Sequence, residues 1–355
     1  MKNVFLIIIV FCVAFSATFF GYTYVREKNI KRTLVRINSV FQNVQVKKPL
    51  DICGWLPWWD IRNALNEYGA HRNFTTLSPF IYILSADGTI ETKINGEQIA
   101  ALHTLEDVKI IPTISNDFDP ERVSMIINDN EKMTAHINDI VTLLKNGNWD
   151  GIDLDYEYLN SSDMDAFTNF VSKLKNALQF ENKLLSVTVH AKTDKDGDWD
   201  AARAQDWPNL AENADYIRIM AYDYHHKNSE PGPIAPLNWL RDITDYAQTT
   251  IPREKRILAL GFYGYEWVGS KNSGDRTLDQ VNGIIISSKA EVNFDENVKA
   301  PFLEYTKAGS THTIWFENGD SIKEKLNIAK NYSGICIWKI GGIPGEIYDL
   351  LPKPS

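Results

Sequence analysis

Three carboxylates alternate along one short segment, residues 150–158. Asp153, Asp155 and Glu157 are each separated by a single apolar or aromatic residue. Successive side chains of a β-strand point to opposite faces, so the three acids share one face. Three ionised groups at this spacing in a poorly solvated interior cannot all stay charged, and at least one must hold a proton near neutral pH. A protonated carboxylic acid beside a carboxylate is the arrangement that glycosidic cleavage requires.

Two other roles for the acidic segment fit its sequence less well. A calcium loop needs polar residues and glycine between its ligands, whereas this segment has Ile152, Leu154 and Tyr156 there. An acidic sheet edge exposed to solvent would not need such apolar neighbours. Asp150 begins the strand with the opposite orientation to the three acids, so we expect it to be a structural partner.

The segment belongs to a series of short, β-branched apolar runs that alternate with helical patterns. A helix is expected after the fourth run, where five apolar residues at helical spacing begin at Phe167 and Ser162 and Asp165 suit the start. A last helix is expected over residues 320–332. The candidate strands are residues 52–56, 77–84, 108–114, 151–157, 184–190, 216–223, 257–263 and 334–340.

Eight strand–helix units in about 300 residues predict an α/β fold, a (β/α)8 TIM barrel over residues 51–352. Residues 264–319 lie between the seventh strand and the last helix and predict a small α+β insertion, with strand-like runs at 283–287 and 311–316. In such a barrel the three acids point inward, toward the mouth where the strands end. A doubly wound open sheet would need a glycine-rich phosphate loop after the first strand, and Cys53-Gly-Trp-Leu-Pro57 is not one.

The composition of the 355 residues limits the function and the compartment. The formal net charge is -9, and residues 1–36 carry six Lys/Arg and one Glu, so the remaining 319 residues carry -14. A body this acidic argues against nucleic acid as a partner. Residues 4–25 have no charge and predict a signal peptide or an N-terminal membrane anchor within residues 1–25, followed by a basic linker over 26–50. The basic residues that follow this segment do not by themselves favour export. Because of the chemistry of the acidic strand we nevertheless expect the barrel to be exported, either secreted or anchored to the membrane. We also expect a monomer.

Few residues outside the acidic strand suggest a metal site or a disulfide. His225 and His226 follow the sixth strand without other ligands, and the Asp194–Asp198 stretch resembles a calcium loop only faintly, so we expect a solvated turn and no metal. Cys53 and Cys336 fall on the first and last strands, which are neighbours in a closed barrel. We expect buried free thiols, because adjacent parallel strands offer poor disulfide geometry.

The acidic strand resembles a known signature. Asp150-Gly-Ile-Asp-Leu-Asp-Tyr-Glu157 is similar to the D-G-x-D-x-D-x-E motif of family-18 glycoside hydrolases, which include chitinases and peptidoglycan-acting N-acetylglucosaminidases. Met220-Ala-Tyr-Asp-Tyr224 resembles the family's sixth strand, Gly334-Ile-Cys-Ile-Trp338 its eighth, and the segment from Gly54 to Trp59 its first. The resemblance covers about residues 51–350 and looks closest to bacterial cell-wall and spore-type members, from residues 199–207 and 314–317.

The resemblance implies a retaining, substrate-assisted mechanism without a cofactor. Glu157 would be the general acid, and the substrate's own 2-acetamido oxygen would be the nucleophile. Asp155 would hold the acetamide N–H, Asp153 would share a proton with Asp155, and Tyr222 would donate its hydroxyl to the acetamide oxygen. The resemblance and the positions after the strands also imply a set of substrate-binding residues: Trp338 as the floor under the sugar, with Asp223, Met220, Trp55, Trp58 and Trp267 at the cleft.

Three functions remain open on this evidence. The first is a hydrolase of β-linked N-acetylglucosamine glycans, of the chitin, peptidoglycan or N-glycan type. The second is a carbohydrate-binding protein on the same barrel with no turnover, and the third is an anchored structural protein with a vestigial barrel. Binding relatives typically lose the acid, and this chain keeps Glu157, Asp155 and Tyr222, which favours the enzyme.

Overall fold

The computed structural model describes residues 50–269 and 271–352. The expected leader and the linker lie outside these ranges, apart from residue 50. Within the described part, none of the helices combines the length and the apolar character needed to cross a membrane. Residues from Leu50 onward form one compact unit.

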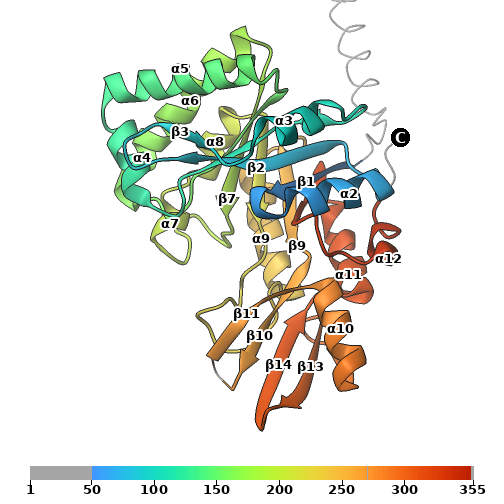
Figure 1. The fold of residues 1–355 in the computed structure, drawn as a ribbon. Coiled ribbons are helices and arrows are strands. Elements are labelled where there is room, and N and C mark those ends of the chain that lie inside the picture. The colour runs from blue at the N-terminus through green and yellow to red at the C-terminus, as the bar shows by residue number, and fades with distance from the viewer. Residues whose placement is uncertain (1–49, 270, 353–355) are drawn as a thin grey trace, which may run out of the picture. The chain divides into compact units, whose positions relative to one another are not determined.

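Eight parallel strands close into a barrel (Figure 1). The first strand pairs with both its successor and the last strand, so the sheet has no free edge inside the ring. This confirms the (β/α)8 expectation and rules out an open sheet. In spatial order the strands are β1 (Asp51–Pro57), β15 (Gly334–Trp338), β9 (Arg256–Gly261), β8 (Tyr216–Met220), β7 (Leu184–His190), β6 (Gly151–Asp155), β5 (Thr113–Ser115) and β2 (Thr76–Leu84), with β3 (Ile90–Thr92) and β4 (Lys109–Ile110) also paired to β2.

The third expected strand is divided into β4 and β5. Ile111 and Pro112 lie between the two pieces. Proline has no N–H to give to a strand ladder, so the pairing is interrupted there. Several other strands end earlier than expected, and Glu157 and Tyr222 therefore lie in the loops just beyond β6 and β8.

Helices surround the barrel and cover its outer face (Figure 1). The apolar residues of the acidic strand face them, because Ile152, Leu154 and Tyr156 are buried in the main core cluster. The apolar stripe expected after the fourth strand is buried along α6, although no side chain caps that helix. The helices are α2 (Ile61–His71), α3 (Gly96–His103), α4 (Pro120–Ile127), α5 (Asn130–Asn146), α6 (Met164–Phe180), α7 (Asp200–Arg203), α8 (Trp207–Glu212), α9 (Leu237–Thr250), α11 (Gly319–Ala329) and α12 (Gly345–Tyr348), with 3₁₀ turns η1 (Trp58–Asp60) and η2 (Ser161–Asp163).

The residues between β9 and α11 form a small separate sheet with one helix, as the α+β expectation states. Five antiparallel strands pack in the order β11 (Lys271–Thr277), β10 (Tyr263–Val268), β14 (Ser310–Phe316), β13 (Ala300–Lys307) and β12 (Val292–Asp295). The expected strand at 283–287 is wrong, since it lies in helix α10 (Leu278–Ser288). Thr277 and Gln280 form a capping box that starts this helix, and this local signal outweighs the β-branched run of isoleucines.

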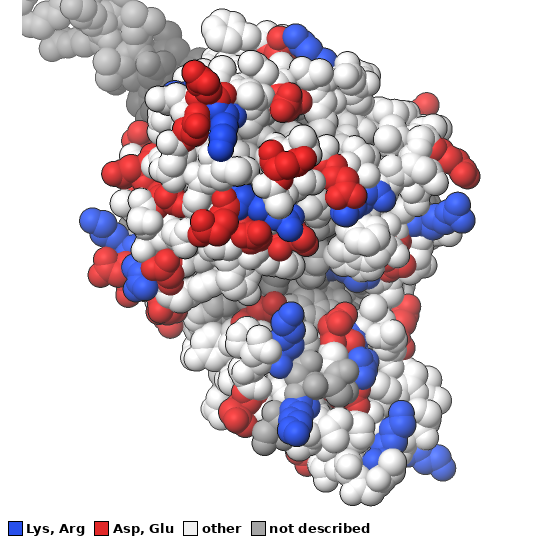
Figure 2. All heavy atoms as spheres, turned by 60° about the vertical axis from the view of Figure 1, so that its left-hand side comes forward, with Lys and Arg blue, Asp and Glu red and all other residues white. Residues whose placement is uncertain are grey.

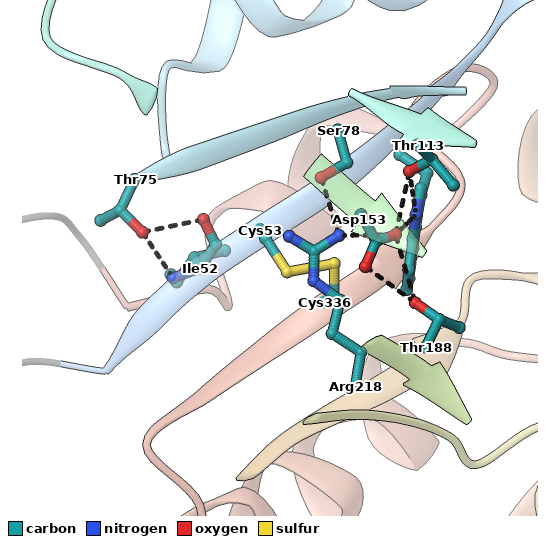
Figure 3. Close-up of a disulfide and its surroundings, with 10 residues drawn as sticks. Ile52, Cys53, Thr75, Ser78, Thr113, Asp153, Thr188, Arg218 and Cys336 are labelled. Atoms are coloured by element: carbon teal, nitrogen blue, oxygen red, sulfur yellow. Dashed lines mark hydrogen bonds and ion pairs between the residues drawn. A yellow bond between two sulfur atoms is a disulfide. The ribbon is translucent and has the colours of Figure 1, made fainter. Parts of the chain in front are cut away.

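A disulfide joins Cys53 of β1 to Cys336 of β15 (Figure 3). The expectation of free thiols is therefore wrong. The two residues are directly opposite each other in the parallel pairing, and their Cα atoms are 4.4 Å apart. Both cysteines belong to the cluster of side chains that fills the barrel interior. The sequence showed that the strands are neighbours, whereas the register between them comes only from the closed barrel.

Candidate active site

The deepest acid, Asp153, is fully buried in the barrel interior (Figure 3). It accepts hydrogen bonds from side chains of three other strands and forms an ion pair with Arg218 of a fourth. Its Oδ2 atom lies 2.9 Å from the Thr113 hydroxyl and 3.1 Å from a guanidinium nitrogen of Arg218. The Thr188 hydroxyl is 3.1 Å from Oδ1 and 3.2 Å from Oδ2, and the Trp55 indole N–H is 3.2 Å from Oδ2. These contacts fix the carboxylate firmly in place.

Asp155 lies two residues further along β6, closer to the barrel mouth, and its environment differs from that of Asp153. It is 5% exposed, and its Oδ1 atom is buried with no hydrogen-bond partner among the described residues. Burial and the nearby charges of Glu157 and Asp153 hold the pKa of Asp155 well above its ordinary value of 3.8, against an opposing effect of Arg218. Few buried polar atoms lack a hydrogen-bond partner, and a catalytic role is one explanation for such an atom.

Glu157 follows β6 at the barrel mouth, and its side chain is 14% exposed. Burial, and then the charge of Asp223, raise its pKa from 4.5 to about 8. The residue therefore carries a proton at neutral pH, as a general acid must. The sequence expectation that the strand keeps a proton near neutral pH agrees with these directions for Asp155 and Glu157.

Three polar residues that the sequence analysis did not single out hold Glu157 and its surroundings. The Asn116 side chain, after β5, accepts the backbone N–H of Glu157 at 2.9 Å and donates to its carbonyl at 2.8 Å. His190 ends β7 with Nε2 3.9 Å from a Glu157 carboxylate oxygen, and burial lowers its pKa to about 3, so the ring is uncharged. Gln205 accepts the backbone N–H of His190 at 2.7 Å. The alternation of side chains along a strand could have predicted that His190 points into the barrel, because it lies two residues after the inward-facing Thr188.

The end of β8 brings the second part of the site. Tyr222 is half-buried, and its pKa lies well above 10.0 because of burial and the carboxylates around it, of which Asp155 and Glu157 contribute most. Asp223 follows it and accepts hydrogen bonds from Tyr263 and from Tyr265 at 3.3 Å. Asp223 is exposed as a residue, and partial desolvation of its carboxyl group raises its pKa despite these bonds. Met220 is 9% exposed.

The insertion begins beside these residues. Tyr263 and Tyr265 belong to β10, the first strand of the antiparallel sheet, so the insertion contributes directly to the surroundings of Asp223. Figure 2 shows the surface hollowed between the barrel and the smaller lobe, with Asp and Glu side chains gathered on the barrel side.

An aromatic cluster lies at the ends of β1, β2 and β15. Trp338 is half-buried, with ring centroids 5.7 Å from Phe80 and 6.3 Å from Trp59. Trp59 is 53% exposed and Trp58 is 38% exposed. The role of Trp338 as the floor under a sugar, and of Trp58 at the cleft, stays a prediction.

The expectation that Trp55 and Trp267 bind substrate is wrong, because both rings are buried. Trp55 is 1% exposed, and its indole N–H points to Asp153 and Thr113, so its ring supports the acid from inside the barrel. Trp267 is fully buried in the insertion, where its N–H bonds to the Ser229 carbonyl. Position after a strand does not decide whether a ring faces the cleft or packs beneath a loop.

A second aromatic cluster was not expected from the sequence. Phe118, Tyr158 and Trp199 follow β5, β6 and β7 and are 58%, 48% and 38% exposed. The Tyr158 ring centroid is 5.7 Å from Phe118 and 5.2 Å from Trp199. Trp199 also contacts His190, with centroids 4.5 Å apart. Exposed rings therefore follow β6 and the strands on both sides of it, and Glu157 lies in the loop just beyond β6.

The remaining polar candidates are structural. The carboxylate of Asp150 accepts the backbone N–H of Ile110 at 2.7 Å, as expected for a structural partner. Asp194 accepts the backbone N–H groups of Asp196 and Gly197, which is the geometry of a simple turn. Across residues 50–269 and 271–352, no group of three or more His, Cys, Asp or Glu is arranged to hold a metal ion.

Comparison with known proteins shows which family the chain belongs to. The glycosylase YdhD of Bacillus subtilis (strain 168) is 29% identical over 315 residues, which cover 83% of this chain and 74% of the relative. The cortical fragment-lytic enzyme of the same organism is 28% identical over 295 residues, covering 79% of this chain and 68% of the relative. The crystal structure of the Bacillus cereus spore cortex-lytic enzyme SleL has the same fold, with a TM-score of 0.78 and 22% identity over 85% of this chain and 73% of that one. The sequence pattern of the glycosyl hydrolases family 18 matches residues 53–342, and the chain belongs to this family.

Proposed function

We propose that this protein is a retaining hydrolase of β-linked N-acetylglucosamine glycans that uses the substrate's acetamide as its nucleophile. The observation that carries the proposal is the buried Asp155, whose Oδ1 atom has no partner within the described chain, beside Glu157 at the barrel mouth. The raised pKa of Glu157 supports its role as the acid. A protein nucleophile would be a carboxylate free to approach the sugar, and the buried Asp155 is better suited to accept an amide N–H.

The proposal assigns one group to each step of the reaction. Glu157 gives its proton to the glycosidic oxygen as the acetamide oxygen attacks the anomeric carbon. Asp155 accepts the acetamide N–H and stabilises the positive oxazolinium ring, while Tyr222 donates its hydroxyl to the acetamide oxygen. Glu157, now a carboxylate, takes a proton from the water that opens the ring. Holding the nucleophile within the substrate gives a proximity advantage, worth about 7–11 kcal/mol in favourable cases.

The names of the relatives favour a bacterial cell-wall glycan as the substrate. Two of them refer to lysis of the spore cortex or of its fragments. Exposed aromatic rings on both sides of Glu157 also suit a polymer that extends past the cleaved bond in both directions. Endo action on a peptidoglycan-type chain is therefore the specific form of the proposal.

We also infer that the barrel works outside the cytoplasm, with residues 1–25 as its leader and residues 26–50 as a linker. The Cys53–Cys336 disulfide supports this, because disulfides persist in oxidising compartments and are rare in the cytosol. Fractionation of cells that express the full chain, with an antibody to the barrel, would test the location. Recovery of the protein in the cytosol with reduced cysteines would contradict it.

The test of the activity is to incubate the purified protein with peptidoglycan, chitin oligosaccharides and N-glycans and to identify the products by mass spectrometry. Deacetylated oligosaccharide should be a poor substrate, and a stable ring-closed analogue of the oxazoline should inhibit competitively.

Glu157→Gln should abolish turnover and keep sugar binding, and Tyr222→Phe should lower kcat more than it raises KM. Equal cleavage of acetylated and deacetylated chains would overturn the substrate-assisted mechanism, and normal turnover by Glu157→Gln would remove the acid from its role. Sugar binding without turnover by the unmodified protein would favour a carbohydrate-binding function.

A further inference from the structure

The chain that follows β15 folds around a single carboxylate. Glu67 lies on α2 and is half-buried. Its Oε1 atom accepts the backbone N–H groups of Gly341 at 3.2 Å and Ile343 at 3.3 Å, and its Oε2 atom accepts that of Gly342 at 2.8 Å. The Tyr348 hydroxyl of α12 also donates to Oε1. Three successive N–H groups that point at one carboxylate form a backbone nest, which is a specific arrangement for binding an anion.

Two glycines give the nest its shape. The φ angle is +118° at Gly341 and +77° at Gly342, in the region that side chains of L residues rarely adopt. There is also no space for a side chain. A Cβ atom on Gly341 would lie 2.7 Å from the Asp60 carboxylate, and one on Gly342 would lie 2.7 Å from a side-chain atom of Thr277. The backbone conformation that directs the N–H groups at Glu67 therefore depends on glycine at both positions.

The nest begins three residues after Trp338, the predicted floor under the sugar. Trp338 lies at the end of the barrel ladder, where its carbonyl accepts the Phe262 N–H at 2.7 Å. The next residue, Lys339, forms an ion pair with Asp60 at 3.0 Å. Beyond this ion pair, the hydrogen bonds to Glu67 hold the backbone of the loop. Two acids that follow β1 therefore hold the segment that carries the ring.

The part of the chain that supplies these acids also carries a second exposed ring. Trp59 belongs to η1, which ends at Asp60, and α2 begins at the next residue. The ring centroids of Trp59 and Trp338 are 6.3 Å apart. Because Glu67 joins α2 to the loop after β15, its hydrogen bonds also fix how these two rings lie relative to each other.

We propose that Glu67 is a positioning residue for glycan binding, which holds the Trp338 ring beside Trp59 through the nest. A ring that is already fixed before the sugar arrives loses little conformational freedom on binding, so the affinity is higher. This inference rests on the proposed function, since it takes Trp338 as a sugar-binding ring. Glu67 itself touches no substrate and acts through the loop.

A double-mutant cycle on glycan affinity tests the proposal. Chitin oligosaccharides are titrated by calorimetry into the purified Glu157→Gln protein, which should bind them without turnover. Adding Glu67→Gln places an NH2 donor against the nest, so Kd should rise about fivefold. In a protein that already carries Trp338→Ala, the same change should leave Kd unaltered, because the ring through which Glu67 acts is gone. Glu291→Gln makes the same chemical change at an exposed position and should also leave Kd unaltered.

Hydrogen exchange tests the nest without any glycan. Peptides that cover residues 341–343 should exchange at least about tenfold faster in Glu67→Gln than in the unmodified protein, because their N–H groups lose a good acceptor. Peptides that cover β6 should be unchanged. If Glu67→Gln does not fold, Glu67→Asp carries the test, since it keeps the charge but has too short a side chain to reach all three N–H groups.

These two measurements separate the inference from the proposed function. If the unmodified protein binds none of the oligosaccharides, the proposed function fails together with the glycan-binding part of the inference, whereas faster exchange in Glu67→Gln would still establish that Glu67 holds the loop. If the oligosaccharides bind, an unchanged Kd in Glu67→Gln would overturn the proposal. An equal rise in Kd with and without the Trp338 ring, or unchanged exchange of residues 341–343, would also overturn it.

Discussion

Replacing Glu157 by glutamine should stabilise the folded protein at alkaline pH while it abolishes catalysis. The carboxyl of Glu157 has a pKa of about 8 in the folded chain and its ordinary value of 4.5 in the unfolded chain. Between these values the unfolded chain has released a proton that the folded chain still holds, so the stability of the unmodified protein falls as pH rises. Glutamine keeps the shape and cannot ionise, and the fall should disappear.

The size of the effect follows from the two pKa values. One pH unit corresponds to 1.36 kcal/mol, so the change from 4.5 to about 8 gives an upper bound of about 5 kcal/mol above pH 8. The measured gain should be smaller, because the side chain is 14% exposed and water can reach the charged form. We expect Glu157→Gln to be more stable than the unmodified protein by at least about 1 kcal/mol at pH 9 and to match it near pH 4.

The assay is urea denaturation of both proteins, followed by tryptophan fluorescence from pH 4 to pH 9 with the disulfide kept oxidised. Glu291→Gln is the matched control, since it makes the same chemical change at an exposed position before β12. The control should show no comparable dependence on pH. A Glu157→Gln variant that is equally stable or less stable than the unmodified protein at pH 9 would refute the idea that this acid is held protonated by burial.

Three further predictions concern activity and stability. The kcat/KM should fall as pH rises through about 8, because Glu157 must donate a proton, and a fall centred below pH 6 would contradict this. Trp59→Ala should raise KM for a glycan about tenfold in steady-state kinetics, since the ring is 53% exposed. Trp267→Ala should lower the free energy of unfolding by about 3–5 kcal/mol and leave KM unchanged, since this ring is fully buried. A raised KM in Trp267→Ala with an unchanged KM in Trp59→Ala would refute both expectations. Replacing Cys53 and Cys336 by serine should lower stability by up to about 5 kcal/mol, because the bond closes a very long loop, and an unchanged urea midpoint would argue against a formed disulfide.

Local patterns in the sequence were sufficient to predict the architecture. Apolar runs recur at the spacing of strand–helix units, and the acids of β6 alternate with residues that the helices must cover. The alternating acids follow the two-residue period of a strand, and the apolar stripes follow the 3.6-residue period of a helix. Both periods can be recognised from neighbouring residues alone. Errors arose where two local signals competed, as in α10, where a capping box overrode an apolar run that resembles a strand.

Side-chain partners across the barrel were decided only by the tertiary structure. Trp55 resembles a cleft residue in the sequence, and the closed barrel turns its indole toward Asp153. Arg218 lies 65 positions after Asp153 in the sequence, and the two meet only because β8 and β6 face the same interior. The sequence by itself predicted that one of the three acids, Asp153, Asp155 or Glu157, would hold a proton near the mouth of the barrel. Which acid holds it depends on burial and on charges brought together by ring closure, and no local pattern of residues contains that information.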